Sequence, residues 1–288
     1  MIRRFPLALA LAVLPPTPLH TQEIGPAGGS LVIVGGGQLD TSILERFLEL
    51  AGGADAPIIV IPTAGGADEY GPYWEGLRGL KAAGATNLTV LHTTDRTVAN
   101  SDAFVEPLRR ARGVWFSGGR QWRLADSYLG TKTHEELWAL LGRGGVIGGT
   151  SAGATIQGSY LARGDTRNNT IMMGDHEEGM GFLKRTSIDQ HLLRRNRQFD
   201  LLEVVRAHPD LLGIGIDENT AIVVEGDRFT VIGAGYVAIY DHERALDSGG
   251  QFYFLAPGDR FDLKNRLAER PTRGWEPLER VEHRPWRE

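Results

Sequence analysis

The sequence contains no cysteine, and this absence removes several kinds of chemistry. A cysteine nucleophile, disulfide bonds and thiolate metal sites are all excluded. A basic run is also missing, and the formal net charge of −5 gives no support to a nucleic-acid partner or to binding at an anionic membrane. No apolar run is long enough to span a bilayer. What remains is the composition of an ordinary globular enzyme.

Motifs for metals and nucleotides are missing as well. The eight histidines include no His-Glu-x-x-His sequence and no close pair on one helix face. Gly35, Gly36 and Gly37 invite comparison with a dinucleotide-binding loop, but Leu39 and Asp40 follow, and no Walker-type lysine comes after them. We therefore interpret these glycines as a tight loop at a strand end. We expect neither a metal nor an organic cofactor.

The first 22 residues resemble a secretory signal peptide. Arg3 and Arg4 provide the positive end, and residues 6–14 provide a short apolar stretch. No Ala-x-Ala cleavage site follows, and a structureless tail is the alternative interpretation. The pattern predicts a signal peptide at 1–22, a single domain at 23–265 and a polar tail at 266–288. It also predicts a secreted or periplasmic protein.

Short apolar runs alternate with helix-length amphipathic segments through the first half of the chain. This rhythm predicts an α/β fold, a single three-layer domain with a mainly parallel sheet and helices on both faces. The expected strands are 31–34, 58–61, 88–91, 114–116 and 145–148, and the expected helices are 41–51, 70–83, 103–111 and 133–141. Further short strands at 213–216, 221–224, 229–232 and 235–240 are expected to be antiparallel additions to the same sheet.

Residues 146–155 are the most informative stretch, because a buried strand there runs into a serine. Gly149-Thr-Ser151-Ala152-Gly153 fits the glycine-flanked elbow, in which a strand turns sharply into a helix and lifts one hydroxyl above the sheet edge. The turn has no room for side chains beside the serine, so glycine is expected two residues before it and two residues after it. The Ala152 N–H lies at a helix N-terminus, where developing negative charge is stabilised. A turn of small residues without chemistry is the alternative.

A nucleophilic serine needs a base, and the base needs an orienting acid. The candidate base is His191, in a segment with one carboxylate and three arginines that we expect to begin a helix. The candidate acid is Glu218, which follows an apolar strand, and Asp189 competes with it. Arg195 and Arg197 fit capture of a carboxylate-bearing substrate. A solvated basic helix start is the alternative for that segment.

These blocks resemble the cyanophycinase family of serine peptidases, which also includes the aspartyl dipeptidases. The similarity runs from about residue 30 to residue 245, and four blocks occur in family order. They are Phe-Ser-Gly-Gly at 116–119 with Gln121, Gly-Thr-Ser-Ala-Gly-Ala at 149–154, Asp-Gln-His at 189–191 with Arg195 and Arg197, and Gly-Ile-Gly-Ile-Asp-Glu-Asn-Thr-Ala at 213–221.

The resemblance implies a fold similar to class I glutamine amidotransferases, which is flavodoxin-like. It implies a serine peptidase that hydrolyses a β-aspartyl isopeptide bond in a peptide or polymer through an acyl-enzyme, and it suggests a homodimer. The implied catalytic residues are Ser151, His191 and Glu218. The implied oxyanion hole consists of Gly118, Gly119 and Ala152, and the implied substrate-binding residues are Gln121, Asp189, Arg195 and Arg197.

The chain also departs from the family pattern. Arg120 stands where an aspartate usually precedes Gln121, Leu192 replaces a phenylalanine, and Asp200 stands where a further arginine is usual. The catalytic set is intact, whereas part of the recognition set is changed. Two other functions stay open at this point: a general serine esterase, whose acid would precede the histidine in the chain, and a catalytically silent binding protein on the same fold.

Overall fold

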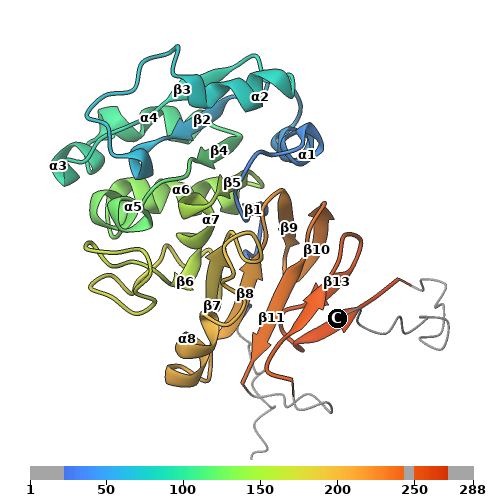
Figure 1. Ribbon diagram of the computed structural model, residues 1–288. Coiled ribbons are helices and arrows are strands. Elements are labelled where there is room, and N and C mark those ends of the chain that lie inside the picture. The colour runs from blue at the N-terminus through green and yellow to red at the C-terminus, as the bar shows by residue number, and fades with distance from the viewer. Residues whose placement is uncertain (1–22, 243–249, 272–288) are drawn as a thin grey trace, which may run out of the picture.

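The computed structural model describes residues 23–242 and 250–271. The segment 1–22, expected as a signal peptide, lies outside the described residues, as does most of the expected polar tail. The described start of that tail, Leu267–Glu269, forms an edge strand, β14, paired with β13. The chain folds into an α/β structure built on two sheets (Figure 1).

The main sheet has nine strands in the order β14-β13-β10-β9-β1-β5-β4-β2-β3. Its parallel part runs from β1 through β5, β4 and β2 to β3, and the rest is antiparallel. The strands are β1 (Ser30–Val34), β2 (Ile58–Ile61), β3 (Leu88–Val90), β4 (Gly113–Phe116), β5 (Val146–Thr150), β9 (Thr220–Glu225), β10 (Arg228–Gly233), β13 (Arg260–Asp262) and β14. The expected mainly parallel α/β core with antiparallel additions is therefore confirmed.

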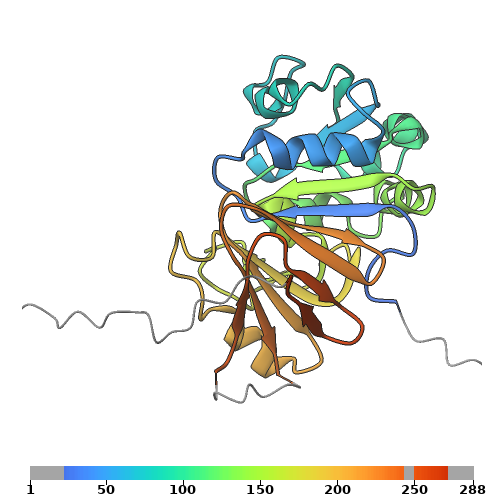
Figure 2. The ribbon, with the colours of Figure 1, turned by 90° about the vertical axis from the view of Figure 1, so that its right-hand side faces the viewer.

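Helices cover both faces of the parallel part. They are α1 (Thr41–Ala51), η1 (Thr63–Gly65), η2 (Glu75–Leu77), α2 (Arg78–Ala82), α3 (Arg96–Ala99), α4 (Asp102–Arg110), α5 (Gln121–Tyr128) and α6 (Lys132–Gly142). The apolar residues of α1 recur at helical spacing, so one side of the helix is buried against the sheet. Figure 2 shows α1 along one face of the main sheet, above β1 and β5.

One expected helix is much shorter than its pattern indicated. We expected a helix at residues 70–83, but only Glu75–Leu77 and Arg78–Ala82 are helical, the first as a 3₁₀ turn. The sequence Gly71-Pro72 near the start opposes a helix, because proline disfavours helical backbone in the residue before it. The Tyr70 ring instead packs edge-on against Trp74, with 5.1 Å between the ring centroids.

The second sheet has five strands in the order β12-β11-β8-β7-β6. They are β6 (Gly158–Tyr160), β7 (Leu183–Gln190), β8 (Leu212–Ile216), β11 (Val237–Asp241) and β12 (Tyr253–Leu255), with the elbow helix α7 (Ala152–Thr155) before β6 and α8 (Leu201–Ala207) before β8. Two expectations were wrong here. The segment before and at His191 is a strand and a turn rather than a helix start, and only β9 and β10 join the main sheet, whereas β8 and β11 belong to the second.

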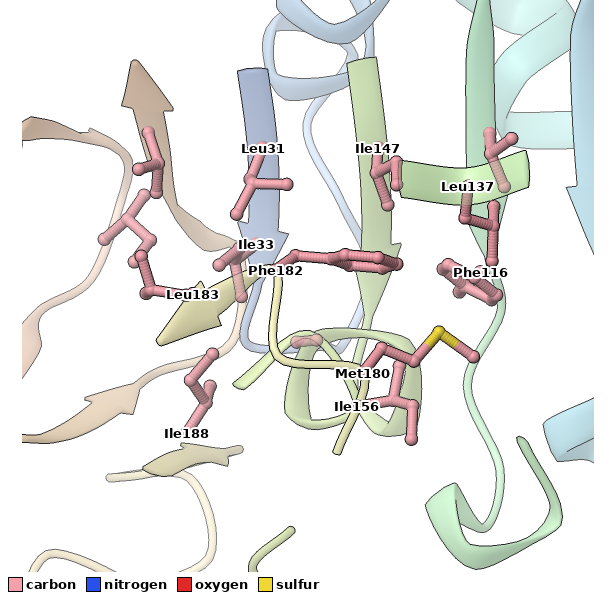
Figure 3. Packing of buried hydrophobic residues seen from close by; sticks show 14 of the residues in the cluster. Leu31, Ile33, Phe116, Leu137, Ile147, Ile156, Met180, Phe182, Leu183 and Ile188 are labelled. Carbon is pink, nitrogen blue, oxygen red and sulfur yellow. The ribbon is translucent and has the colours of Figure 1, made fainter. Parts of the chain in front are cut away.

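The two sheets share one core. Apolar residues of β1 and β5 pack with those of β7, β8 and the segment before β7, so the sheets are joined by buried side chains. Figure 3 shows the Phe182 ring alongside the strand that carries Ile147, between Ile33 and Phe116. The outer face of the second sheet is covered by α8. Throughout the described ranges, every helix is too short or too polar to cross a membrane.

Candidate active site

Ser151 lies on a strained turn between β5 and α7. Its φ is 57° and its ψ is −114°, a backbone conformation that non-glycine residues rarely adopt. A Cβ at position 149 would lie 2.3 Å from the Gly153 carbonyl oxygen, and one at 153 would lie 2.4 Å from that of Phe116. Both glycines are therefore required by close backbone approach, as expected for an elbow that exposes a serine hydroxyl.

His191 reaches this serine from the second sheet. It follows β7 directly, has a φ of 55°, and its backbone N–H donates to the Gly35 carbonyl at 2.8 Å. Its Nε2 lies 2.9 Å from the Ser151 Oγ, within hydrogen-bond distance. The sequence places these side chains 40 residues apart, and the fold brings them into contact.

Glu218 completes a row of hydrogen-bonding groups. It lies between β8 and β9, where the chain crosses from the second sheet to the main sheet, and its Oε1 is 2.6 Å from His191 Nδ1. This contact favours the tautomer in which Nδ1–H donates to the carboxylate and Nε2 is free to accept the serine proton. Serine, histidine and glutamate therefore have the geometry of a nucleophile, a base and an orienting acid.

The glycines after β1 pack directly against the side chains of His191 and Glu218. A Cβ on Gly36 would lie 2.3 Å from the His191 ring, and a Cβ on Gly37 would lie 2.6 Å from a Glu218 carboxylate oxygen. Their φ angles, 115° and 76°, also favour glycine. The loop is thus a strand end that leaves room for the histidine and the glutamate, as its sequence indicated.

The electrostatic surroundings keep His191 neutral. Burial lowers its pKa below the usual value, because the charged imidazolium is poorly solvated there. The Glu218 carboxylate acts in the opposite direction, and the charges of Arg195 and Arg197 lower the pKa further. A histidine that is neutral near pH 7 can accept a proton from a serine.

Three backbone N–H groups are the candidates for an oxyanion hole beside Ser151. Gly118 lies against the serine, since a Cβ there would be 3.3 Å from Ser151 Cβ. Gly119 has a φ of 143° and approaches the Ala64 carbonyl so closely that a Cβ would be 2.0 Å from its oxygen. In the described part of the chain, no hydrogen bond occupies the N–H groups of Gly118, Gly119 and Ala152. These donors stay available for a negatively charged oxygen.

Three of the four expected substrate-binding residues are buried and have partners inside the protein. Gln121 is 1% exposed and its amide donates to the Ala162 and Arg163 carbonyls at 2.8 and 3.0 Å. Asp189 is fully buried, with its oxygens 2.8 and 2.9 Å from Arg163 nitrogens. Arg197 is 7% exposed and donates to both oxygens of Gln190. All three side chains thus bond to other parts of the protein, and their role in substrate binding stays a prediction.

Arg195 differs from these three residues. Its side chain is exposed, its backbone N–H donates to the His191 carbonyl at 3.0 Å, and its charge acts on the His191 ring. Across the described residues, its guanidinium forms no ion pair or hydrogen bond. It is therefore free to bind a carboxylate beside Ser151, His191 and Glu218, which we call the catalytic row. Asp189, the competing acid, is held by Arg163 and leaves Glu218 as the partner of His191.

Arg163 is the residue that the sequence did not reveal. It is 2% exposed, and its guanidinium contacts Asp189, Asp200 and the Asn169 carbonyl. Asp200, which stands where the family usually has an arginine, thus pairs with Arg163. Nothing in the local sequence around residue 163 marks it as buried, because its partners lie 26 and 37 residues further along the chain.

Metal binding has no support in the described residues, among which no group of three or more suitable His, Asp or Glu side chains occurs. His176 contacts two carboxylates: its Nε2 lies 2.7 Å from Asp126 Oδ1 and its Nδ1 lies 3.0 Å from Asp175 Oδ1. Those contacts form a polar bridge between α5 and the loop before β7.

Comparison with known proteins places the chain in a family. The model of peptidase family S51 matches residues 31–232. The chain is 33% identical over 273 residues to a cyanophycinase from Geminocystis herdmanii (strain PCC 6308), a match that covers 85% of this chain and 96% of the relative. It is 32% identical over 263 residues to a cyanophycinase from Nostoc sp. (strain PCC 7120 / SAG 25.82 / UTEX 2576), covering 82% and 86%.

Solved structures agree with this placement. A peptidase from an acI-B1 Actinobacterium superposes with a TM-score of 0.62 at 25% identity, over 82% of this chain and 97% of that chain. A putative peptidase E from Listeria monocytogenes EGD-e superposes with a TM-score of 0.53 at 18% identity, over 73% and 100%. The second match shows the fold alone.

Proposed function

Because the chain belongs to peptidase family S51 and is a serine-type peptidase, we propose that it hydrolyses an amide bond formed through an aspartyl side chain, with Ser151 as nucleophile. The observation that carries the proposal is the hydrogen-bonded row of Ser151, His191 and Glu218 beside unoccupied backbone N–H groups. A serine esterase of the α/β-hydrolase type would have its acid before the histidine in the chain, whereas Glu218 follows it.

The proposed mechanism has two halves. His191 Nε2 takes the Ser151 proton as Oγ attacks the carbonyl carbon, and the resulting oxyanion accepts hydrogen bonds from backbone N–H groups of Gly118, Gly119 and Ala152. The histidine then gives its proton to the leaving amine, which leaves an acyl-enzyme. Water, deprotonated by His191, attacks that ester and releases the acid. Glu218 holds the ring and stabilises its charged form throughout.

Recognition in this proposal depends on Arg195. The free carboxylate of an aspartyl residue is a planar acceptor that a guanidinium can bind with two parallel hydrogen bonds. Arg195 has an unoccupied guanidinium close to His191, so a carboxylate bound there would lie near the attacked carbonyl. The relatives named cyanophycinase support a peptide or polymer carrying aspartyl groups as substrate.

The test is to identify the bond that is cut. One substrate is the dipeptide β-Asp-Arg, and the second is a synthetic aspartate oligomer that carries an arginine on each side-chain carboxyl. Mass spectrometry then separates free arginine, intact β-Asp-Arg and shorter oligomers. We expect free arginine from both substrates, and none with Ser151→Ala. Release of intact β-Asp-Arg from the oligomer, without free arginine, would move the cut to the main chain and overturn the bond proposed.

Two further properties are proposed on the sequence alone. Residues 1–22 would direct export to the periplasm or the medium, which N-terminal sequencing of the protein from a fractionated bacterial host tests directly. The family resemblance supports a homodimer, and light scattering of the purified protein measures it. Retention of residues 1–22 on a cytoplasmic protein would overturn the first property, and a monomer mass would overturn the second.

A further inference from the structure

Exposed aromatic side chains gather in one place on the surface. Of the six large apolar residues exposed in the described part of the chain, three lie there: Phe199 (61% exposed), Tyr236 (48%) and Phe254 (36%). Phe252 connects them, with ring centroids 5.7 Å from Phe199 and 5.5 Å from Phe254, and Tyr236 lies 5.9 Å from Phe254. We call these four rings the aromatic strip. Clustered exposed apolar residues mark binding surfaces more often than scattered ones do.

The aromatic strip borders the catalytic row. The carbonyl of Tyr236 accepts a hydrogen bond from the N–H of Asp217 at 3.1 Å, and Glu218 is the next residue. Phe199 lies in the segment that begins at His191, and the Tyr240 hydroxyl fixes that segment by donating to the Gln198 carbonyl at 2.8 Å. Tyr236 therefore lies at the end of the second sheet from which His191 and Glu218 project, and the strip runs from there along the edge strand β12, where Phe254 pairs with Ala238 of β11.

Carboxylates lie at both ends of the aromatic strip. At one end, Asp200 follows Phe199, and its side chain is 37% exposed although one oxygen contacts Arg163. Burial and the charges of Asp189 and Asp200 raise the pKa of Tyr240, whose ring packs 5.1 Å from Phe252. At the other end, Asp217 lies beside Tyr236, with one oxygen accepting the backbone N–H groups of residues 193 and 194.

We propose that the aromatic strip is an accessory subsite that binds a guanidinium group of the substrate, on a unit beyond the one whose bond is cut at Ser151. Ring faces attract cations, and a planar guanidinium stacks on them while its edge donates to carboxylates such as Asp200. A substrate whose terminal aspartyl carboxylate is bound by Arg195 would then present the guanidinium group of the neighbouring unit to the strip. This inference rests on the proposed function and extends it from one bond to a longer substrate.

A second copy of the chain fits the strip less well. In a twofold dimer the same patch meets itself, which would bring the acidic ends formed by Asp200 and Asp217 towards each other. A purely apolar segment would cover the rings but leave the second carboxylate oxygen of Asp200, whose first oxygen contacts Arg163, without a hydrogen-bond donor. Charge complementarity therefore favours a cation, and planarity favours guanidinium over ammonium.

Binding to the full-length Ser151→Ala protein tests the subsite, because the substrate is then not consumed. The ligands are the dipeptide β-Asp-Arg, the arginine-carrying aspartate oligomer, and the same oligomer with leucine in place of arginine beyond the first unit. Phe199→Leu and Phe254→Leu keep apolar surface but remove a ring, so each should weaken binding of the arginine oligomer by about two- to fivefold. Phe199→Trp should retain binding, and Leu267→Ala, an exposed apolar residue on the edge strand β14, should change nothing.

The outcomes separate the subsite from the catalytic proposal. Binding of the dipeptide should be equal in all these proteins, and the leucine oligomer should bind no better than the dipeptide. Unchanged binding of the arginine oligomer to the Phe→Leu variants would overturn the subsite while leaving the catalytic proposal intact. If the leucine oligomer binds as tightly as the arginine oligomer, the strip is an apolar binding surface instead. If the variants change the oligomeric state, the strip is a self-association surface. If wild type hydrolyses none of the aspartyl substrates, both proposals fail.

Discussion

The main sheet and the second sheet each hold part of the candidate active site, and they hold it by different means. The main sheet presents Ser151 on a turn of glycine and alanine, where lack of space fixes the backbone. The second sheet presents His191 after a strand whose polar side chains are buried, among them Ser187, Asp189 and Gln190. One half depends on close packing of small residues, and the other on a buried polar network.

This difference indicates where each kind of mutation should act. Steric changes near β1 and β5 should alter the positions of the reacting atoms. Charge changes around β7 should act through Arg163 and Asp189, a buried ion pair whose loss leaves an unpaired charge. The catalytic row lies where the two sheets meet, so either kind of change should alter its geometry.

The largest effect is expected at the nucleophile. Ser151→Ala removes the attacking oxygen but adds no volume, so the fold should persist while kcat falls by about 10⁴- to 10⁶-fold. Activity against the aspartyl substrates and the thermal unfolding midpoint measure the two effects. Retention of more than a few per cent of wild-type activity would show that the main sheet does not supply the nucleophile.

The next effect separates two carboxylates associated with the second sheet. Glu218→Gln should lower kcat by about 10²- to 10⁴-fold with little change in stability, because the acid orients His191. Asp189→Asn should instead destabilise the fold by about 3–5 kcal/mol, because Arg163 loses its buried partner. Kinetics and denaturant unfolding on both variants test this contrast. A folded Asp189→Asn with the larger loss in kcat, and a near-normal Glu218→Gln, would reverse the roles.

A third change tests the contact between the sheets. Gly36 belongs to the loop after β1, and a Cβ there would meet the His191 ring at 2.3 Å. Gly36→Ala should displace the ring and lower kcat about 100-fold, the scale of a small misplacement of reacting groups. Gly52→Ala is the matched control, because its φ of 106° carries the same backbone strain with nothing within 4 Å. Equal loss of kcat in both variants would attribute the effect to backbone strain alone.

The smallest effect concerns Arg195. Arg195→Lys should reduce kcat/KM about ten- to a hundredfold, because a fork of two parallel hydrogen bonds to a carboxylate is lost. Arg194→Lys, at the exposed neighbouring position, is the control. No change in kcat/KM on any aspartyl substrate would make Arg195 an ordinary surface residue.

Removal of the Arg195 charge should also move the pH profile. The base must be neutral, so kcat/KM falls as the pH drops through the pKa of His191, which lies below its usual value. Because Arg195 contributes to lowering that pKa, Arg195→Gln should shift the acid limb to higher pH. An unchanged limb would mean that the Arg195 charge does not act on the pKa of His191.

The parallel part of the main sheet could be predicted closely from the sequence, whereas the edge strands β13 and β14 and strand β7 of the second sheet could not. Apolar runs such as Ile58–Ile61 give β1, β2, β4 and β5 directly, because a parallel strand buried on both faces is continuously apolar. In contrast, β7 reads Leu-Lys-Arg-Thr-Ser-Ile-Asp-Gln, which has no clear apolar alternation. Asp189 can be buried there because Arg163, distant in the sequence, forms an ion pair with it.

The candidate site was likewise predictable only in part. Ser151, His191 and Glu218 were expected from local motifs, and the fold brings them together. Their catalytic roles remain a prediction. Burial separates Gln121, Asp189 and Arg197 from Arg195, and no local pattern indicates which polar side chain will be buried. No local pattern predicts the aromatic strip, because Phe199 and Tyr236 are connected only by way of the rings of Phe252 and Phe254.

The most direct test of the central claim, that the base from the second sheet activates the serine from the main sheet, is covalent labelling. Wild type, His191→Ala and Ser151→Ala are treated with a fluorophosphonate, and peptide mapping by mass spectrometry locates the adduct. We predict one adduct on Ser151 in wild type, slowed by orders of magnitude in His191→Ala and absent in Ser151→Ala. An adduct on another serine, or equally fast labelling of Ser151 without His191, would contradict the claim.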